Sequence, residues 1–242
     1  MTTFPILLEQ AHSAPRRRYG QHVIALSTVE VLRRALNIVI ALAALVVLLP
    51  LILVIAIAVK LSSPGPVFYT QTRVGLNRRH VLPPGSRYRH ADRGGKPFTI
   101  FKFRTMRVND GGSEGAHRQV WATPDDPRIT RVGRILRLYR LDELPQLVNV
   151  LFGDMDIVGP RPEQPVIFAQ LREQIPGYQQ RQGVRPGITG WAQINQHYDA
   201  SIDDVRRKLA FDLEYIGRRS LTEDLRIMLR TLPVVAGRFG GW

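Results

Sequence analysis

The segment that decides the fold runs from Ala35 to Val59 and reads ALNIVIALAALVVLLPLILVIAIAV. Only Asn37 and Pro50 interrupt its 25 otherwise apolar residues. A helix that crosses a bilayer needs about 20 such residues, and a helix in a soluble core is seldom apolar on every side. Its length and its position behind a polar arm differ from those of a signal peptide. We therefore interpret this segment as a membrane helix of the mature protein.

The residues that flank and interrupt this segment indicate a helix that does not cross the membrane. Arg33 and Arg34 lie before the apolar core of the segment, and Lys60 and Arg73 lie after it. Because basic flanks favour the cytoplasmic side, a re-entrant helix with both ends on that side satisfies both flanks. Pro50 removes a helix hydrogen bond and clashes with the carbonyl four residues earlier, which forces a kink or a break. A kinked helix that crosses the membrane is the alternative.

The charge balance of the chain indicates a polyanionic partner. The 242 residues include 34 basic and 20 acidic ones, a net charge of +14. Only four of the basic residues are lysine, and the planar guanidinium of arginine suits phosphate oxygens, although genomic base composition explains most of the arginine content equally well. Nucleic acid, anionic lipid and nucleotides all fit this charge. The absence of cysteine excludes disulfides, thiolate metal sites and cysteine nucleophiles.

We expect an α+β fold that is mainly helical and has three parts. A basic N-terminal arm occupies residues 1–32, and its low periodicity suits a segment that lies on anionic headgroups. The re-entrant membrane helix, broken at Pro50, occupies residues 33–62. A small folded domain with a short β element and amphipathic surface helices occupies residues 63–242.

Residues 98–104 read FTIFKFR, an alternation typical of a β-strand. Phe101 and Phe103 are expected on one face of this strand. Lys102 and Arg104 then lie on the other face, so the sequence predicts two cations that point the same way.

Two helices are expected in the middle of the chain. Helical spacing covers Val132 to Tyr139. The next helix has Asp142 as its N-cap, Pro145 in its first turn and Gly153 as its stop. The positive end of that helix dipole is therefore expected beside Asp142.

Two amphipathic helices are expected near the C-terminus. An apolar stripe from Val205 to Ile216 ends at Gly217. Ser220 and Glu223 form a capping box that opens the next helix, and Pro233 is expected to end it. Such helices either close a core or lie on a membrane surface, and packing in the core is the default.

The strongest candidate site is the segment RLYRLDELPQ, from Arg137 to Gln146. Its adjacent carboxylates, Asp142 and Glu143, are expected at a helix N-terminus, with arginines three and six residues before Glu143. Oxygen ligands suit Mg²⁺, and guanidinium groups and helix amides suit phosphate, so the segment can hold both. An isolated aspartate at such a position is more often only an N-cap.

Two arginines next to prolines strengthen this prediction. Arg161 lies between two prolines in GPRP, and Arg185 precedes Pro186 in RPGITGW. Because proline restricts the backbone, it preorganises a guanidinium at little entropic cost. Asp154 and Asp156 add a second acidic pair before Arg161. A rigid surface loop would explain either arginine alone, but it explains both together poorly.

Six motifs follow one another along the chain: KLSSPGPVF with QTRVG (60–75), FKFRTM (101–106), DPRITRVG (126–133), LDELPQ (141–146), GPRP (159–162) and RPGITGW (185–191). Their order is the one seen in the bacterial sugar transferases. On these motifs the chain resembles the monotopic polyprenyl-phosphate phosphoglycosyl transferases, which start exopolysaccharide, O-antigen or glycoprotein glycan assembly. The resemblance extends from about residue 33 to about residue 235.

The resemblance implies transfer of a sugar 1-phosphate from a UDP-sugar to polyprenyl (undecaprenyl) phosphate, with release of UMP. It implies a covalent intermediate on Asp142, with Glu143 beside it, and both carboxylates as ligands of Mg²⁺. It also implies a helix re-entrant at Pro50 in the bacterial inner membrane, with the catalytic domain on the cytoplasmic face. A homo-oligomer is compatible with this arrangement. The expected phosphate-binding residues are Lys102, Arg104, Arg137, Arg161 and Arg185.

The chain departs from the family pattern at two places. The loop 78–95 is longer than the short turn usual there. Asp156 occupies a position where a small hydroxyl residue is common, which adds a negative charge near the expected phosphate site. No multi-span region precedes the membrane helix in this sequence, so we expect a minimal form of the family.

A different class of function is a membrane-tethered basic protein that binds nucleic acid or anionic lipid without catalysis. The net charge alone would support such binding through counterion release. The sequence contains no recognisable nucleic-acid module, and its acidic pairs would repel a phosphate backbone unless a metal intervened. We therefore expect an enzyme with no nucleic-acid partner.

Overall fold

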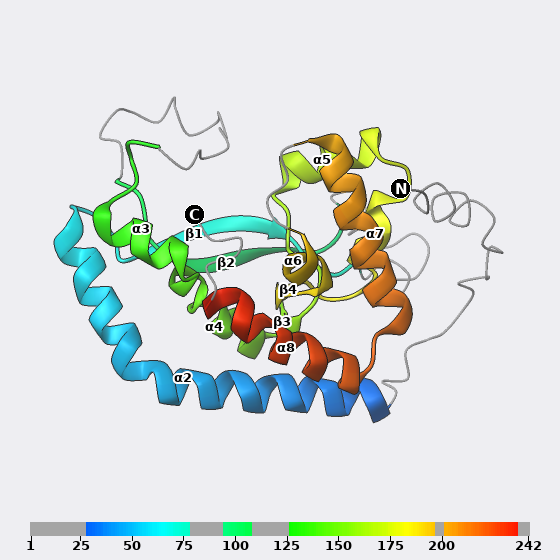
Figure 1. Ribbon diagram of the computed structural model, residues 1–242, viewed down its shortest axis with the longest axis horizontal. Coiled ribbons are helices and arrows are strands. Elements are labelled where there is room, and N and C mark those ends of the chain that lie inside the picture. Colours follow the sequence, from blue (N-terminus) through cyan, green and yellow to red (C-terminus); the bar gives the residue numbers. More distant parts are fainter. Residues whose placement is uncertain (1–27, 78–93, 108–125, 197–200, 237–242) are drawn as a thin grey trace, which may run out of the picture.

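The computed structural model describes residues 28–77, 94–107, 126–196 and 201–236. Predictions for the N-terminal arm up to residue 27 and for residues 78–93 of the long loop lie outside these ranges. The described part is mainly helical with two small sheets, as expected (Figure 1). Its elements in chain order are α2 (Thr28–Ser62), β1 (Phe68–Val74), β2 (Pro97–Phe103), α3 (Arg131–Leu138), the 3₁₀ turn η4 (Leu141–Glu143), α4 (Gln146–Phe152), β3 (Asp156–Val158), α5 (Pro165–Gln174), the 3₁₀ turn η5 (Tyr178–Gly183), β4 (Gly187–Thr189), α6 (Trp191–Asn195), α7 (Ile202–Arg218) and α8 (Leu221–Ala236).

The apolar segment forms one helix, α2, which is long and apolar enough to cross a membrane by length and composition. It begins at Thr28, five residues before the predicted boundary, and contains 35 residues. The chain stays helical through Pro50, so the predicted break takes the form of a bend. Figure 1 shows two straight arms of α2 that meet at an angle. An interior proline explains a bend because it removes one hydrogen bond and displaces the carbonyl four residues earlier.

One side of α2 packs on the rest of the protein along both arms. Ala41 lies in a core cluster with residues of β2 and α4. Ile55 and Val59 lie in a second cluster with Phe103 and Leu136. Large apolar side chains on the other side of the helix remain exposed, and Leu61 is 82% exposed. The helix therefore contributes to the protein core and also presents an apolar surface.

Polar side chains fasten the half of α2 before Pro50 to the rest of the protein. The Arg33 guanidinium donates to the Asp224 carboxylate of α8 over 2.6 and 2.9 Å. Arg34 donates to the Val150 carbonyl over 2.5 Å and so caps the C-terminal end of α4. The amide oxygen of Asn37 accepts a 2.6 Å hydrogen bond from the backbone N–H of Ile157. The Arg33–Asp224 contacts are buried and the other two are partly buried, so an unpaired polar group there would be costly.

The C-terminal end of α2 is fastened to the same domain by Arg104. Its buried guanidinium donates to the carbonyls of Val59 and Ser63 over 3.2 and 2.7 Å, and also to the Pro64 carbonyl. These carbonyls lie at or just beyond the end of the helix, where a cation is favourable at the negative end of the helix dipole. Both ends of α2 are therefore attached to one folded unit.

The two sheets are short and position the site loops. Strands β1 and β2 pair antiparallel, with Phe68 opposite Phe103 and Tyr69 opposite Lys102. Strands β3 and β4 pair in parallel through Asp156 with Gly187 and Val158 with Thr189. Because Val158, the last residue of β3, is paired with Thr189, the position at which the GPRP loop (159–162) begins is fixed by the sheet.

The described helices confirm most local predictions and correct three of them. Asp142 is not the N-cap of α4, because a 3₁₀ turn contains it and α4 starts only after Pro145. Helix α7 ends at Arg218, one residue beyond the predicted stop. Pro233 does not end α8 but lies in its last turn, where few hydrogen bonds remain to be lost. One half of the predicted capping box is present: the Ser220 hydroxyl accepts from the Glu223 N–H over 3.1 Å, while the Glu223 carboxylate pairs with Arg218 and Arg226.

Candidate functional site

The acidic pair lies on a tight turn between α3 and α4. Arg140 has φ 53° and ψ 22°, and it is the one non-glycine residue with positive φ in the described part of the chain. Such a conformation is uncommon for a residue with a Cβ, and it occurs most often where function requires it. The turn that follows buries both carboxyl groups, leaving Asp142 9% and Glu143 6% exposed.

Two cations neutralise Glu143. Lys102 of β2 lies 2.7 Å from Oε1, while the Arg161 guanidinium donates to Oε1 over 2.5 Å and to Oε2 over 3.1 Å. Burial disfavours the charged carboxylate, but Arg161 and Lys102 outweigh it and hold the pKa of Glu143 well below its usual range. Glu143 is therefore ionised and anchors both cations.

Asp142 is the less engaged member of the pair. Its nearest ion-pair partner among the described residues is Lys102, whose Nζ lies 4.0 Å from Oδ2. Burial raises the pKa of Asp142 and Glu143 adds to this effect, while Lys102, Arg161 and Arg137 oppose it. The result is a partly desolvated carboxylate with little direct hydrogen bonding, which suits a group that must react.

Arg137 lies in the last turn of α3 and acts on the turn of the acidic pair through its charge. Its Nε donates to the Thr105 hydroxyl over 3.0 Å, and an Nη lies 3.5 Å from the Met106 sulfur. Its charge favours the ionised form of Asp142, which lowers the pKa of that carboxyl. Three of the five predicted phosphate-binding cations, Lys102, Arg137 and Arg161, therefore surround the acidic pair.

The structure places the other two predicted cations elsewhere. Arg104 caps α2, because the chain turns after β2 ends at Phe103 and strand alternation no longer applies. The Nε of Arg185 donates to the Gly153 carbonyl over 3.1 Å, and Nη1 lies 3.9 Å from Asp156. Neither guanidinium joins Lys102 at the carboxylates of Asp142 and Glu143.

The negative charge of Asp156, which the sequence places near the phosphate site, is compensated in this second cluster. Arg219 lies 3.1 Å from one carboxylate oxygen, and Arg34 and Arg185 each lie 3.9 Å from the other. Burial raises the pKa of Asp156, and these arginines oppose the rise. Asp156 of β3 therefore links Arg34 of α2 with Arg219, the residue that follows α7.

Two arginines at the site are absent from the predicted set. Arg140 precedes the acidic pair, and its pKa is lowered by burial and by Arg161, against the opposing charges of Glu143 and Asp142. Arg73 of β1 donates to the Pro162 carbonyl over 3.1 Å and so contacts the loop that carries Arg161. Both arginines belong to the motifs quoted above, which was the signal available in the sequence.

The carboxylate oxygens of the acidic pair suit a magnesium ion that is also bound by the phosphate of a substrate. Mg²⁺ in proteins commonly uses one or two carboxylates together with substrate phosphates and water. The described residues contain no group of three or more His, Cys, Asp or Glu side chains that could hold a metal alone. Asp142 would supply the freer carboxylate for such an ion, and Glu143, whose two oxygens already contact Lys102 and Arg161, would be its second ligand.

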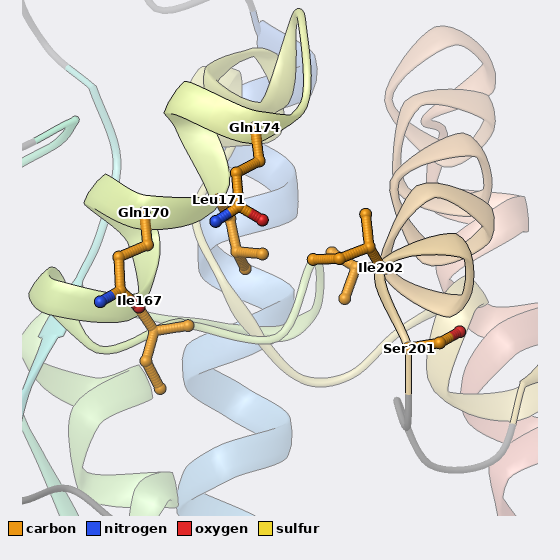
Figure 2. A pocket seen from close by; sticks show the side chains of 7 residues that line it. Ile167, Gln170, Leu171, Gln174, Ser201 and Ile202 are labelled. Atoms are coloured by element: carbon orange, nitrogen blue, oxygen red, sulfur yellow. The ribbon is translucent and has the colours of Figure 1, made fainter.

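A hollow of about 330 Å³ lies away from these charges, between α5 and the start of α7 (Figure 2). Figure 2 shows the side chains of Gln170 and Gln174 on α5, opposite Ile202 on α7. None of the described residues that line this hollow is charged, so none of them could neutralise a phosphate, and we place the site at the acidic pair. The lining residues are Ile167, Gln170, Leu171, Gln174, Ser201, Ile202 and Val205.

Comparison with known families gives one match that covers most of the chain. The model of the family described as "Bacterial sugar transferase" matches residues 28–238. The matched region includes α2, the acidic pair and every cation considered above.

Characterised relatives share about two fifths of their residues with this chain. A UDP-N-acetylgalactosamine-undecaprenyl-phosphate N-acetylgalactosaminephosphotransferase of Aeromonas hydrophila is 41% identical over 209 residues, which cover 86% of this chain and 44% of the relative. A UDP-glucose:undecaprenyl-phosphate glucose-1-phosphate transferase of Escherichia coli is 42% identical over 203 residues, covering 83% and 39%. The transferase of the same description from Caulobacter vibrioides is 41% identical over 207 residues, covering 85% and 70%. The chain thus spans less than half the length of the first two relatives.

Proposed function

Since this chain belongs to the bacterial sugar transferase family, we propose that it transfers a sugar 1-phosphate from a UDP-sugar to undecaprenyl phosphate. The observation that carries the proposal is a buried Asp142 with few direct contacts beside an ionised Glu143. The cations Lys102, Arg137 and Arg161 lie around this pair. The names of the relatives supply the substrate classes. This site gives no reason to invoke nucleic-acid binding.

The proposed products follow from the composition of the donor. A relative that moves glucose 1-phosphate from UDP-glucose must leave UMP, because UDP-glucose contains only these two parts. The relatives act on glucose and on N-acetylgalactosamine derivatives, so the proposal specifies a UDP-sugar as its donor class. The lipid product is undecaprenyl diphosphate-sugar, which makes this the first membrane step of a glycan.

We infer two displacements at one carboxylate. An oxygen of Asp142 attacks the phosphorus that carries the sugar, and the bond from this phosphorus to the bridging oxygen breaks, so UMP leaves with that oxygen. The lipid phosphate oxygen then attacks the same phosphorus, and the bond to the Asp142 oxygen breaks. No proton transfer is needed from the lipid, since a phosphate is already an anion at neutral pH. The site therefore never has to hold both substrates together.

The surrounding cations have separate roles in this scheme. Lys102 and Arg161 are held at the acidic pair by Glu143, where they can neutralise the donor diphosphate. Arg137 favours the ionised Asp142 that the attack requires. When bound by Asp142 and Glu143, Mg²⁺ would reduce the repulsion between an anionic nucleophile and the diphosphate.

The attachments of α2 support a re-entrant position in the inner membrane. The half of α2 before Pro50 binds the folded domain through Arg33 and Asn37, and the C-terminal end of α2 binds the same domain through Arg104. A single domain lies on one side of a bilayer, so both ends of the helix lie on that side. The basic flanks favour the cytoplasmic side.

The proposed reaction can be tested with purified full-length protein, Mg²⁺ and a panel of UDP-sugars. We expect UMP to form in an amount equal to the enzyme when no lipid is present, and the peptide Leu141–Gln146 to gain the mass of the sugar phosphate. Undecaprenyl phosphate should then remove the adduct and support multiple turnovers. If UMP forms only when the lipid is present and no adduct is found, the two-step route is wrong. No UMP from any sugar would contradict the function itself.

The membrane position gives a second test, for which the absence of cysteine in the chain is convenient. Single cysteines are placed at Thr28, where α2 begins, and at Thr72 on β1, both exposed. We expect a membrane-impermeant thiol reagent to label both only after the inner membrane is opened. Labelling of either cysteine from the periplasm would contradict the re-entrant helix. Pro50→Leu removes the bend and should shift part of the population toward a crossing helix, with periplasmic labelling at Thr28→Cys.

A further inference from the structure

The loop that carries Arg161 has no secondary structure of its own, yet it is fixed at every carbonyl. Residues 160–164 lie between β3 and α5 in irregular conformation. The carbonyls of Pro160 and Glu163 accept from backbone N–H groups over 3.0 and 2.9 Å. The two carbonyls between them accept from arginine side chains, that of Arg161 from Arg181 over 2.9 Å and that of Pro162 from Arg73 over 3.1 Å.

Arg181 holds this loop at two points. One Nη donates to the Arg161 carbonyl, and the other donates to the carboxylate of Glu163 over 3.2 Å. The two contacts lie two residues apart on the same loop and on either side of Pro162. They therefore fix the backbone from which the Arg161 side chain extends toward Glu143.

Arg181 is itself held by a buried network in η5 and α7. It is only 1% exposed, lies 2.8 Å from the Asp212 carboxylate and donates to the Tyr178 hydroxyl over 2.6 Å. Lys208, on α7 like Asp212, lies 2.9 Å from the Glu163 carboxylate that Arg181 also contacts. Burying so many charges is costly, and hydrophobic residues often stabilise a core equally well. A requirement for exact geometry explains such a network better than a requirement for stability.

We propose that Arg181 is a positioning residue of the transferase reaction: through the Arg161 carbonyl and Glu163 it holds Arg161 beside Glu143, where its guanidinium can meet the donor diphosphate. The proposal rests on the proposed function, because Arg161 is the residue assigned to the phosphate. Arg181 does not approach the acidic pair. Its effect on catalysis is therefore expected to pass entirely through Arg161.

A double-mutant cycle separates this role from a general loss of structure. Arg181→Lys keeps the charge but cannot bind the carbonyl, Glu163 and Asp212 at once. We expect kcat/KM for the UDP-sugar to fall about 10- to 100-fold, as when a supporting residue behind a site is lost. In an Arg161→Gln background the same change should cost less than about threefold, since interacting positions are not additive. An equal fold loss in both backgrounds would overturn the proposal.

Hydrogen exchange gives a readout that does not depend on activity. In Arg181→Lys, peptides that contain Val74 and Gly187, whose N–H groups donate to the carbonyls of this loop, should exchange at least about tenfold faster than in the parent protein, while peptides of α8 stay unchanged. Unchanged exchange in the Val74 and Gly187 peptides would overturn the proposal even if turnover fell. If the loop loosens but the parent protein releases no UMP, the proposed function fails and the positioning of the loop stands.

Two further variants complete the test. Arg206→Lys is the matched control, since Arg206 lies exposed on α7, the helix that carries Asp212, and pairs only with nearby Asp203 in the described part of the chain. It should leave exchange and kcat/KM unchanged.

If Arg181→Lys does not fold, Tyr178→Phe removes one contact of Arg181 and leaves its ion pairs. It should lower kcat/KM several-fold, again only when Arg161 is present, and a loss independent of Arg161 would contradict the proposal.

Discussion

Replacing Asp142 by Asn should lower sugar-phosphate transfer at least about a thousandfold, the scale seen when a covalent nucleophile is removed. Asparagine keeps the shape of the side chain and lacks the charge and the nucleophilic oxygen. It also relieves the burial of a charged group, so the folded protein should be no less stable. The measurement is UMP release per enzyme under saturating UDP-sugar and undecaprenyl phosphate.

The matched control for this variant is Asp203→Asn. Asp203 has a side chain 80% exposed at the start of α7, so the same chemical change there should leave the rate unaltered. The adduct on the Leu141–Gln146 peptide should be absent in Asp142→Asn and present in the control. An Asp142→Asn protein that turns over at the normal rate would end the assignment of Asp142 as nucleophile.

Arg161→Gln should have the second-largest effect. The change removes a two-pronged, charge-assisted contact and leaves Lys102 alone to neutralise Glu143. One lost contact to a charged group costs about 1.5–3 kcal/mol, which corresponds to about 10- to 100-fold in kcat/KM. Arg161→Lys should recover only part of this loss, since a point charge lacks the planar fork. Normal kcat/KM in Arg161→Gln would remove Arg161 from the site.

The same variant has a predicted effect on pH dependence. Attack requires ionised Asp142, so activity is lost as the pH falls through the pKa of that carboxyl, which burial raises above the usual range. Arg161 opposes this rise, so removing its charge raises the pKa further. The acidic limb of kcat/KM should therefore move to higher pH in Arg161→Gln. It should move less in Arg161→Lys, and a shift to lower pH would contradict the charge assignment.

Local patterns predicted the elements that depend on neighbouring residues. Helical spacing and caps gave α3, α7 and α8, because residues three or four apart share a helix face wherever the helix packs. The pairing of Asp142 with Glu143 and the proline-flanked Arg161 were also visible in the sequence. Pro233 was placed wrongly, because the cost of a proline depends on how many hydrogen bonds remain in the helix beyond it.

Contacts between distant residues could not be predicted from spacing. Alternation placed Arg104 beside Lys102, but only the tertiary turn after Phe103 sends Arg104 to the end of α2. Arg33 meets Asp224 across 191 positions in the sequence, and no periodicity connects them. The sequence likewise shows that Arg181 is present but not that it holds the Arg161 loop.

The packing of α2 against the domain has a consequence for how the protein is made. Ala41, Ile55 and Val59 of the helix complete two core clusters, and the later-synthesised Asp224 is the partner of Arg33. A fragment that lacks α2 would expose the apolar faces of β2, α3 and α4 and leave Asp224 buried without its cation. We therefore expect the domain to complete its core only after α2 has packed against it, so that folding of the domain and placement of the apolar helix become one step. For the re-entrant position proposed above, this makes lipid or detergent part of the solvent in which the core forms.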